Sequence, residues 1–191
     1  MSTAGRSIDE ILRRLEKDFK GIAESMFEAY HSDFGFYYRY KARRYLKDAL
    51  RELEELKNMC NSEKGREIIN SEFGSEDKGK TFCIFIDDLM KIVSRTKIHK
   101  IAVLPDKIIK ERIPIYFFEP IGEEVKEITG INCAPKKELL RWRIGFNLDY
   151  VCGYEILARC VGTLRNYLEM VKSLKHGEEK MKKDNTQYAI A

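Results

Sequence analysis

The residues with the clearest chemical potential form one short run near the N-terminus, between Asp33 and Asp48. Within this run aromatic and basic side chains are interleaved, and no acidic side chain occurs. Aromatic faces can stack on unpaired bases, while neighbouring Lys and Arg groups neutralise phosphates. The same mixture also suits a half-buried helix whose basic side chains extend along its surface to water. The aromatic members are Phe34, Phe36, Tyr37, Tyr38, Tyr40 and Tyr45.

Helical phase divides the run into two faces. If Tyr38 and Ala42 point inward, Tyr37, Tyr40 and Arg44 share the opposite side. That side is either an ordinary solvated face or a contact surface, and nucleic acid is the commonest partner for this chemistry. Both interpretations remain open from the sequence. The predicted nucleic-acid-binding residues, with support from other basic segments, are Tyr37, Arg39, Tyr40, Lys41, Arg43, Arg44, Lys97, Lys100, Arg141 and Arg143.

A second candidate site lies at residues 74–81, which match the pattern GxxxxGK[ST]. These eight residues, and no others, resemble the phosphate loop of P-loop NTPases. The resemblance implies that Lys80 reaches the terminal phosphates of a nucleotide and that Thr81 coordinates magnesium, with Gly74 and Gly79 allowing the loop to wrap. The chain lacks the further strands that the parallel sheet of that family requires. We therefore expect a charged surface loop at this position.

A third pattern pairs Asp106 with Glu124 and Lys126, in the order used by PD…ExK metal-dependent nucleases. That family carries its ExK residues on a strand, whereas residues 122–128 resemble the start of a helix. The three histidines are isolated from one another and from cysteine, without the short spacings of zinc ligands. We expect no catalytic residues, no metal and no cofactor.

Length, composition and charge limit the number of domains and the kinds of partner that the protein can have. The chain has 191 residues, 43% of them hydrophobic, which is enough to bury a core in one domain. A net charge of +4 is too small to require a nucleic-acid partner, although residues 89–115 carry seven basic groups and two acidic ones. No segment has the apolar length of a membrane span. We expect an intracellular protein, cytoplasmic or nuclear, whose five cysteines are mostly buried free thiols.

Apolar periodicity predicts the elements that position these residues. Ser7 and Glu10 form a capping box that begins a long helix, and a second long helix completes an antiparallel hairpin over 7–60. The mixed middle, 61–134, contains a short helix at 62–73 and an exposed loop at 74–80. It continues with an ambiguous segment at 82–96, for which we favour helix. Residues 98–104 and 113–118 have the branched and aromatic composition of strands bounded by proline.

The C-terminal third predicts a helix over 135–175, followed by a flexible tail at 176–191. Gly145, Gly153 and Gly162 interrupt this helix, and their best use is to let another helix or chain approach closely. Residues 1–175 are expected to form a single globular domain. The fold class is α+β and predominantly α-helical, with long N- and C-terminal helices packed around a short β element.

Three functions follow from these patterns. The first is a non-catalytic, nucleic-acid-associated accessory subunit that uses the basic and aromatic helical surface. The second is a protein-interaction or oligomerisation subunit that docks or self-associates through its C-terminal helix. The third, which ranks last, is a nucleotide-binding enzyme that uses the phosphate-loop pattern.

Overall fold

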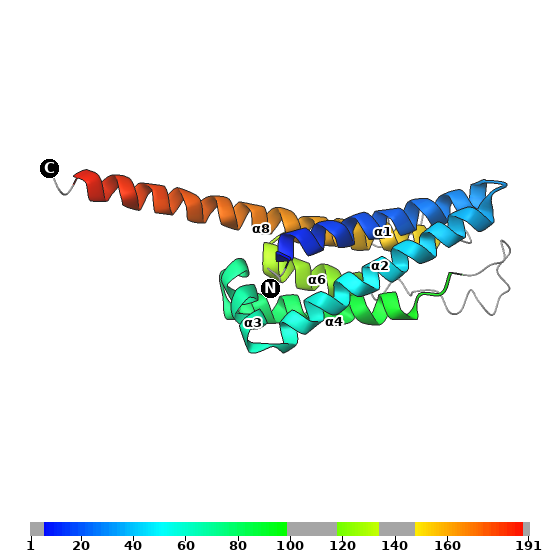
Figure 1. Ribbon diagram of the computed structural model, residues 1–191, viewed down its shortest axis with the longest axis horizontal. Coiled ribbons are helices and arrows are strands. Elements are labelled where there is room, and N and C mark those ends of the chain that lie inside the picture. The colour runs from blue at the N-terminus through cyan, green and yellow to red at the C-terminus, as the bar shows by residue number, and fades with distance from the viewer. Residues whose placement is uncertain (1–5, 99–117, 134–147, 189–191) are drawn as a thin grey trace, which may run out of the picture.

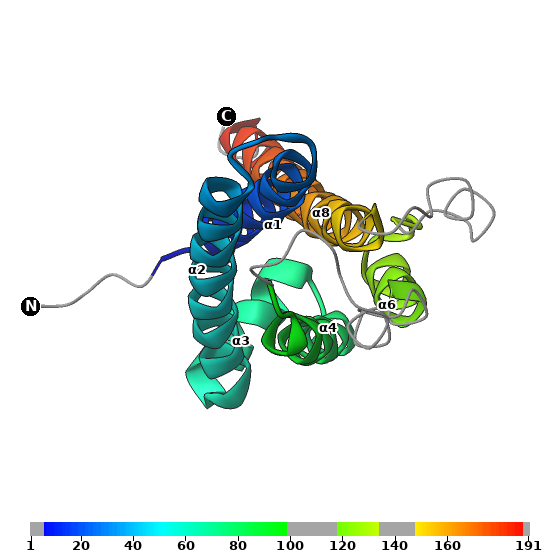
Figure 2. The same ribbon diagram turned by 90° about the vertical axis from the view of Figure 1, so that its right-hand side faces the viewer.

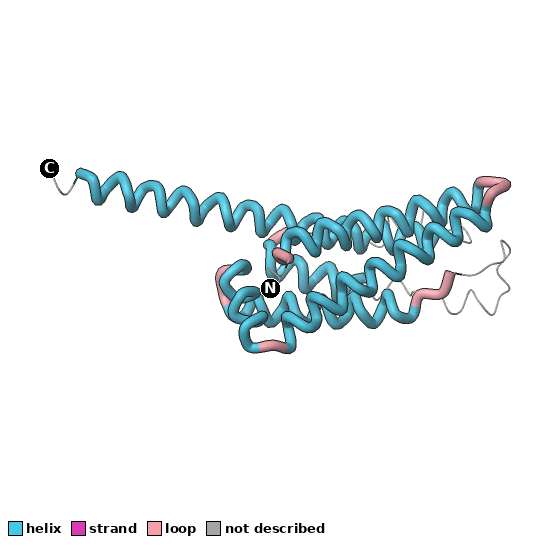
Figure 3. Tube along the Cα trace, in the orientation of Figure 1, coloured by secondary structure: helices cyan, strands magenta, loops and turns pink. Residues whose placement is uncertain are grey.

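The computed structural model describes residues 6–98, 118–133 and 148–188, and these ranges are almost entirely helical (Figures 1 and 3). A long helix, α1, is followed by α2, which runs back alongside it as the predicted antiparallel hairpin. Two shorter helices, α3 and α4, continue the chain. The helices are α1 (Ile8–His31), α2 (Gly35–Asn61), α3 (Glu63–Phe73), α4 (Glu76–Arg95), α6 (Phe118–Thr129) and α8 (Leu148–Tyr188).

The predicted α+β class is wrong, because the described residues contain helices and no strand. Most of the two expected strands, 98–104 and 113–118, lies outside the described residues. The ambiguous segment at 82–96 belongs to helix α4, as favoured from the sequence. Its buried residues recur every three or four positions, whereas Ile84 between them is exposed. A strand buried on both faces would have covered Ile84 as well, so tertiary packing selected the helical period.

Serine side chains begin three of the helices. Ser7 accepts a hydrogen bond from the Glu10 amide at 3.2 Å, and Ser62 accepts one from the Gly65 amide at 3.1 Å. Ser75 accepts one from the Lys78 amide at 3.3 Å. Each side-chain oxygen satisfies an amide that has no partner within the first turn of its helix.

The phosphate-loop pattern is largely helical, which corrects the loop predicted at 74–80. Gly74 ends α3 in the left-handed conformation, with φ +84°, and Ser75 already caps α4. The Gly79 amide donates to the Ser75 carbonyl at 3.1 Å, and Lys80 pairs with Glu76 at 2.9 Å. Because these amides close a helix, they cannot also wrap a phosphate.

Gly79 has a packing role instead. A Cβ atom at this position would lie 2.0 Å from Oδ1 of Asn70, so the glycine makes room for the Asn70 side chain between α3 and α4. Thr81 is also engaged locally, since its hydroxyl donates to the Asp77 carbonyl at 3.0 Å.

Helix α1 lies between α2 and α8 and contributes much of the core (Figure 2). Helix α8 begins at Leu148 and continues to Tyr188, well past the predicted helix end at residue 175. Its C-terminal half projects beyond the other helices (Figure 1). The first part of the predicted helix, 135–147, lies outside the described residues.

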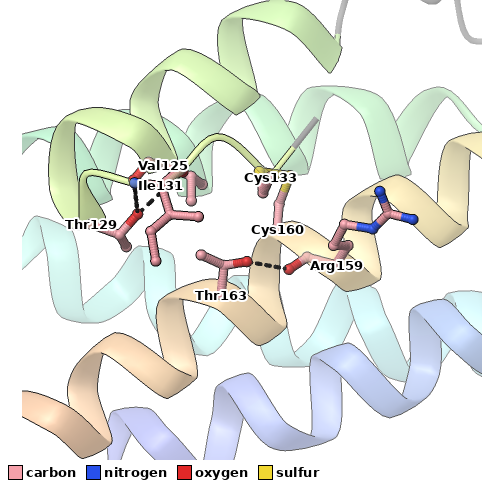
Figure 4. Close-up of a disulfide and its surroundings, with 7 residues drawn as sticks. All are labelled: Val125, Thr129, Ile131, Cys133, Arg159, Cys160 and Thr163. Carbon is pink, nitrogen blue, oxygen red and sulfur yellow. Dashed lines mark hydrogen bonds between the residues drawn. A yellow bond between two sulfur atoms is a disulfide. The ribbon is translucent and has the colours of Figure 1, made fainter. Parts of the chain in front are cut away.

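Two disulfides replace the free thiols expected from the sequence. Cys60 on α2 is bonded to Cys83 on α4, and Cys133 is bonded to Cys160 on α8 (Figure 4). Their Cα atoms lie 5.7 and 5.1 Å apart, within the usual range for disulfides. The bonded cysteines are 23 and 27 residues apart in the sequence, so their pairing could not be predicted from spacing. Only tertiary packing brings them together.

A turn after α6 directs Cys133 toward α8. Gly130 adopts φ +74°, and its amide donates to the Lys126 carbonyl at 2.7 Å. The Thr129 hydroxyl donates to the Val125 carbonyl at 2.7 Å and accepts from the Ile131 amide at 3.1 Å (Figure 4). These bonds fix the direction in which the chain leaves the helix.

Every helix in the described parts of the chain is too short or too polar to cross a lipid bilayer. The same residues contain no group of three or more His, Cys, Asp or Glu side chains placed to hold a metal ion. Glu124 and Lys126 lie on helix α6, so the ExK residues occur on a helix as expected, and Asp106 is outside the described residues.

Candidate nucleic-acid interface

The outer face of α2 carries the exposed members of the aromatic and basic run. Tyr37 is 52% exposed and Tyr40 is 64% exposed, while Ala42 on the opposite side is fully buried. Lys41 and Arg44 are also exposed. The structure therefore has the helical phase in which the tyrosines and these two basic groups point to water. Phe34 and Phe36 extend the exposed aromatic group toward the turn between α1 and α2.

One of the predicted arginines, Arg43, is engaged by the protein itself. The Arg43 guanidinium donates to the Ile98 carbonyl from Nε at 3.2 Å and from Nη2 at 2.9 Å. This contact holds the residues after α4 against α2, and it brings Lys97 toward the same end of the molecule. The guanidinium of Arg39 lies beside Gly35, 3.1 Å from where a Cβ atom there would be. Lys100, Arg141 and Arg143 lie outside the described residues.

A cavity of about 410 Å³ opens between α1 and α2 beside the exposed tyrosines. Aromatic and basic residues of the predicted surface form part of its lining, together with four residues outside that prediction. Gly21 helps to form this arrangement, because a Cβ atom there would lie 2.7 Å from the ring of Tyr45. The lining residues are Lys17, Asp18, Tyr37, Tyr40, Lys41, Arg44, Tyr45 and Asp48.

Asp18 is the unusual member of this lining. It is only 8% exposed, and its carboxyl makes no hydrogen bond or ion pair to any described residue. Burial, followed by the nearby charges of Asp48 and Glu52, raises the pKa of Asp18 to about 7, against weaker lowering by Lys17 and Arg51. Its oxygens are not among the side-chain atoms that are shut off from solvent without a hydrogen bond, so they are open to the cavity, where water or a ligand can donate to them.

A signal for Asp18 was present in the sequence. It lies three residues after Leu15 and four before Ile22, in the apolar stripe that faces the core. An acid within such a stripe marks either an internal ion pair or a polar site. Sequence reasoning missed Asp18 because the stripe was assessed only for helical periodicity.

A second depression of about 410 Å³ adjoins the first and shares Lys17 and Tyr45 with it. Arg13, Lys20 and Arg165 add basic groups to its lining, although Glu16 and Glu24 also belong to it. Arg13 pairs with Asp9 at 3.0 Å, and Lys20 pairs with Glu16 at 2.5 Å. The cationic surface thus continues from α2 onto α1, with part of its charge neutralised locally.

Comparison with known proteins found no matching family model, no similar curated protein and no similar solved structure. The geometry of α1 and α2 therefore carries the functional argument.

Proposed function

We propose that the protein is a non-catalytic accessory subunit that binds single-stranded nucleic acid through the outer face of α2. One observation carries this proposal: the rings of Tyr37 and Tyr40 are more than half exposed beside Lys41 and Arg44. Large aromatic side chains grouped in water next to cations are uncommon on a surface that binds nothing. Rings that stack on bases and cations that hold phosphates are the two components of single-strand binding.

The expected energetics are those of a short, weakly selective contact. Each stacked base contributes about 1 to 3 kcal/mol. If Lys17, Lys41 and Arg44 each neutralise one phosphate, the logarithm of affinity should fall with the logarithm of salt concentration with a slope of about −2. Double-stranded nucleic acid should bind more weakly, because its bases are not free to stack on tyrosine.

Fluorescence anisotropy with a labelled twelve-nucleotide oligothymidylate tests the proposal directly. Replacing both tyrosines with alanine, or Lys41 and Arg44 with glutamine, should each weaken binding about tenfold or more. Lys64→Gln with Arg66→Gln is the matched control, because it removes the same charge from exposed positions on α3. Absence of wild-type binding at low salt, or an equal loss in the control, would reject the proposal.

Docking through the C-terminal helix remains the second candidate, because Met170 and Leu174 are exposed apolar residues on α8. Gly162, one of the glycines that suggested a close partner, already makes room for a residue of the same chain. A Cβ atom at Gly162 would lie 3.2 Å from Glu16 Oε1. Salt separates the two functions. Self-association through apolar residues should persist or strengthen as salt rises, whereas phosphate binding should weaken.

The two disulfides bear on the intracellular location that we propose. Disulfides persist in oxidising compartments, and within cells chiefly in hyperthermophiles. An intracellular location therefore fits these bonds if they form in a cytosol of that kind, or if they form only transiently. Alkylation of free thiols in intact cells before lysis, followed by mass spectrometry of the Cys60 and Cys133 peptides, measures whether the bonds exist at the site of action.

A further inference from the structure

We infer that the cavity between α1 and α2 holds one unpaired guanine base, with its ring among the tyrosines and its donor edge facing the carboxylate of Asp18. This inference rests on the proposed function, because the base would belong to the bound strand. It adds a base preference that stacking alone does not provide.

The first argument is the missing partner of Asp18. The residue is 92% buried by its exposure of 8%, lines the cavity and has no hydrogen bond to any described residue. A carboxylate that is mostly removed from water and lacks protein donors is costly, and a ligand that donates hydrogen bonds to it would offset part of that cost. The occupant of this cavity should therefore present hydrogen-bond donors to Asp18.

The second argument concerns shape. Tyr37, Tyr40 and Tyr45 all contribute to the lining, so the cavity offers aromatic faces to a planar ring. Its volume of about 410 Å³ falls within the range of small-molecule sites, roughly 300 to 1,000 Å³. A flat heterocycle suits this lining better than a branched or extended chain does.

The third argument comes from the cations around the cavity. Lys17, Lys41 and Arg44 share the lining with Asp18 and Asp48. Three cations disfavour an organic cation such as a polyamine, although rings and carboxylates alone would suit one. A nucleotide satisfies both sets of groups, because its base offers donors to a carboxylate and its phosphate is attracted to lysine and arginine.

Guanine is the base that best matches an ionised carboxylate. Its Watson–Crick edge presents two adjacent donors, N1–H and N2–H, and a carboxylate can accept both. Adenine presents one donor and one acceptor there, and cytosine presents one donor and two acceptors, so both instead match a neutral carboxyl group. Uracil and thymine present one donor between two acceptors.

Ionisation of Asp18 should therefore tune the preference. Asp48 and Glu52 on α2 raise the pKa of Asp18 in addition to burial, whereas Lys17 on α1 and Arg51 on α2 lower it, giving a value of about 7. Above this pH the carboxylate predominates and favours guanine. Below it the neutral acid predominates, so the advantage over adenine should shrink.

The experiment compares three labelled oligonucleotides at pH 8.5 and pH 6: an oligothymidylate, and the same strand with one central guanine or one central adenine. Wild-type protein should bind the guanine strand about tenfold tighter than the adenine strand at pH 8.5, and less selectively at pH 6. Asp18→Asn should remove the guanine preference while retaining affinity for oligothymidylate. Asp33→Asn, an exposed position in the turn between α1 and α2, is the matched control.

The outcomes separate this inference from the function on which it rests. Equal wild-type affinity for the three strands, or a guanine preference that survives Asp18→Asn, overturns the base site and leaves strand binding intact. Failure of every strand to bind rejects the proposed function. In that case, binding of free GMP at pH 8.5 tests the base site by itself. Binding that is lost in Asp18→Asn supports the base site, and absence of such binding overturns it. The wild-type pH series tests the inference even if the variant folds poorly.

Discussion

Glu16 and Asp18 are two residues apart on α1 and equally buried, at 9% and 8% exposure, yet within the described residues only Glu16 has cationic side chains at ion-pair distance. Glu16 belongs to the seam between α1 and α8, where Arg165 lies 3.0 Å from Oε2 and Lys20 lies 2.5 Å from Oε1. Asp18 faces the seam between α1 and α2, where the nearby charges include Asp48 and Glu52 and no described donor reaches it.

The difference separates a structural acid from a candidate functional one. A buried acid that is paired can hold two helices together, and removing one partner is then costly. A buried acid without a partner lowers stability, so its presence beside an open cavity points to a role in binding. One seam is closed by protein groups, and the other is completed by a ligand in our proposal.

The largest effect that we expect is a loss of stability when the disulfides are reduced, with no change in the cavity between α1 and α2. Reduction of both disulfides should lower the free energy of unfolding by about 3 kcal/mol for each bond, because each closes a loop of more than twenty residues. Thermal unfolding with and without a phosphine reductant measures this loss. None of the four bonded cysteines lines the cavity, so strand binding by the reduced protein should persist below its unfolding temperature. Loss of binding by a reduced but folded protein would show that the disulfides also shape the cavity.

Removing the paired acid should give the next largest effect. Glu16→Ala leaves Arg165 without its partner across the α1–α8 seam and should destabilise the protein by about 2 to 3 kcal/mol. Urea unfolding measures the change, with Glu24→Ala as the control at an exposed position on the same helix. If the two variants lose equal stability, the seam is not held by Glu16.

Removing the unpaired acid should have the opposite sign. Asp18→Asn should stabilise the protein by about 1 to 2 kcal/mol at pH 8, because the amide carries no buried charge. The pKa of Asp18 is raised from 3.8 to about 7 in the folded state, so its contribution to stability is greatest below pH 4 and declines as pH rises to 7. The advantage of the variant should therefore grow from pH 4 to pH 7 and then level off.

The variant must be compared with wild type at each pH. Glu124 on α6 also loses stabilisation as pH rises, because burial and Asp88 raise its pKa to about 8. The difference between the two proteins removes this shared contribution. A variant that is less stable than wild type at pH 8 would show that Asp18 has a structural partner.

The smallest expected effect tests which charges raise the pKa of Asp18. Asp48→Asn removes one of the negative charges that raise the pKa of Asp18, so this pKa should move downward while remaining above its ordinary value. The carboxyl carbon resonance of Asp18, followed by NMR through a pH titration, reports the shift. An unchanged or higher pKa would show that Asp48 does not act on Asp18.

Several elements were predictable because their causes are local. The serine caps and the apolar stripe of α1 predicted where that helix begins and which face it buries. Residue spacing in α2 placed Tyr37, Tyr40 and Arg44 on one face, and the structure shows that this face is exposed. The predicted β element and the loop at 74–80 failed for different reasons. Branched residues favour strands only weakly without a partner strand, and the capping role of Ser75 was overlooked.

By itself, the sequence determined where α1 and α3 begin and which residues of α2 share a face, because both depend on neighbours within one or two turns. Tertiary structure alone decided that Glu16 meets Arg165 across the α1–α8 seam, and that Asp18 makes no hydrogen bond or ion pair within the described part of the chain. It also decided which cysteines are joined. Those outcomes depend on the register between helices that are distant in the chain, and residue spacing within one helix does not encode that register.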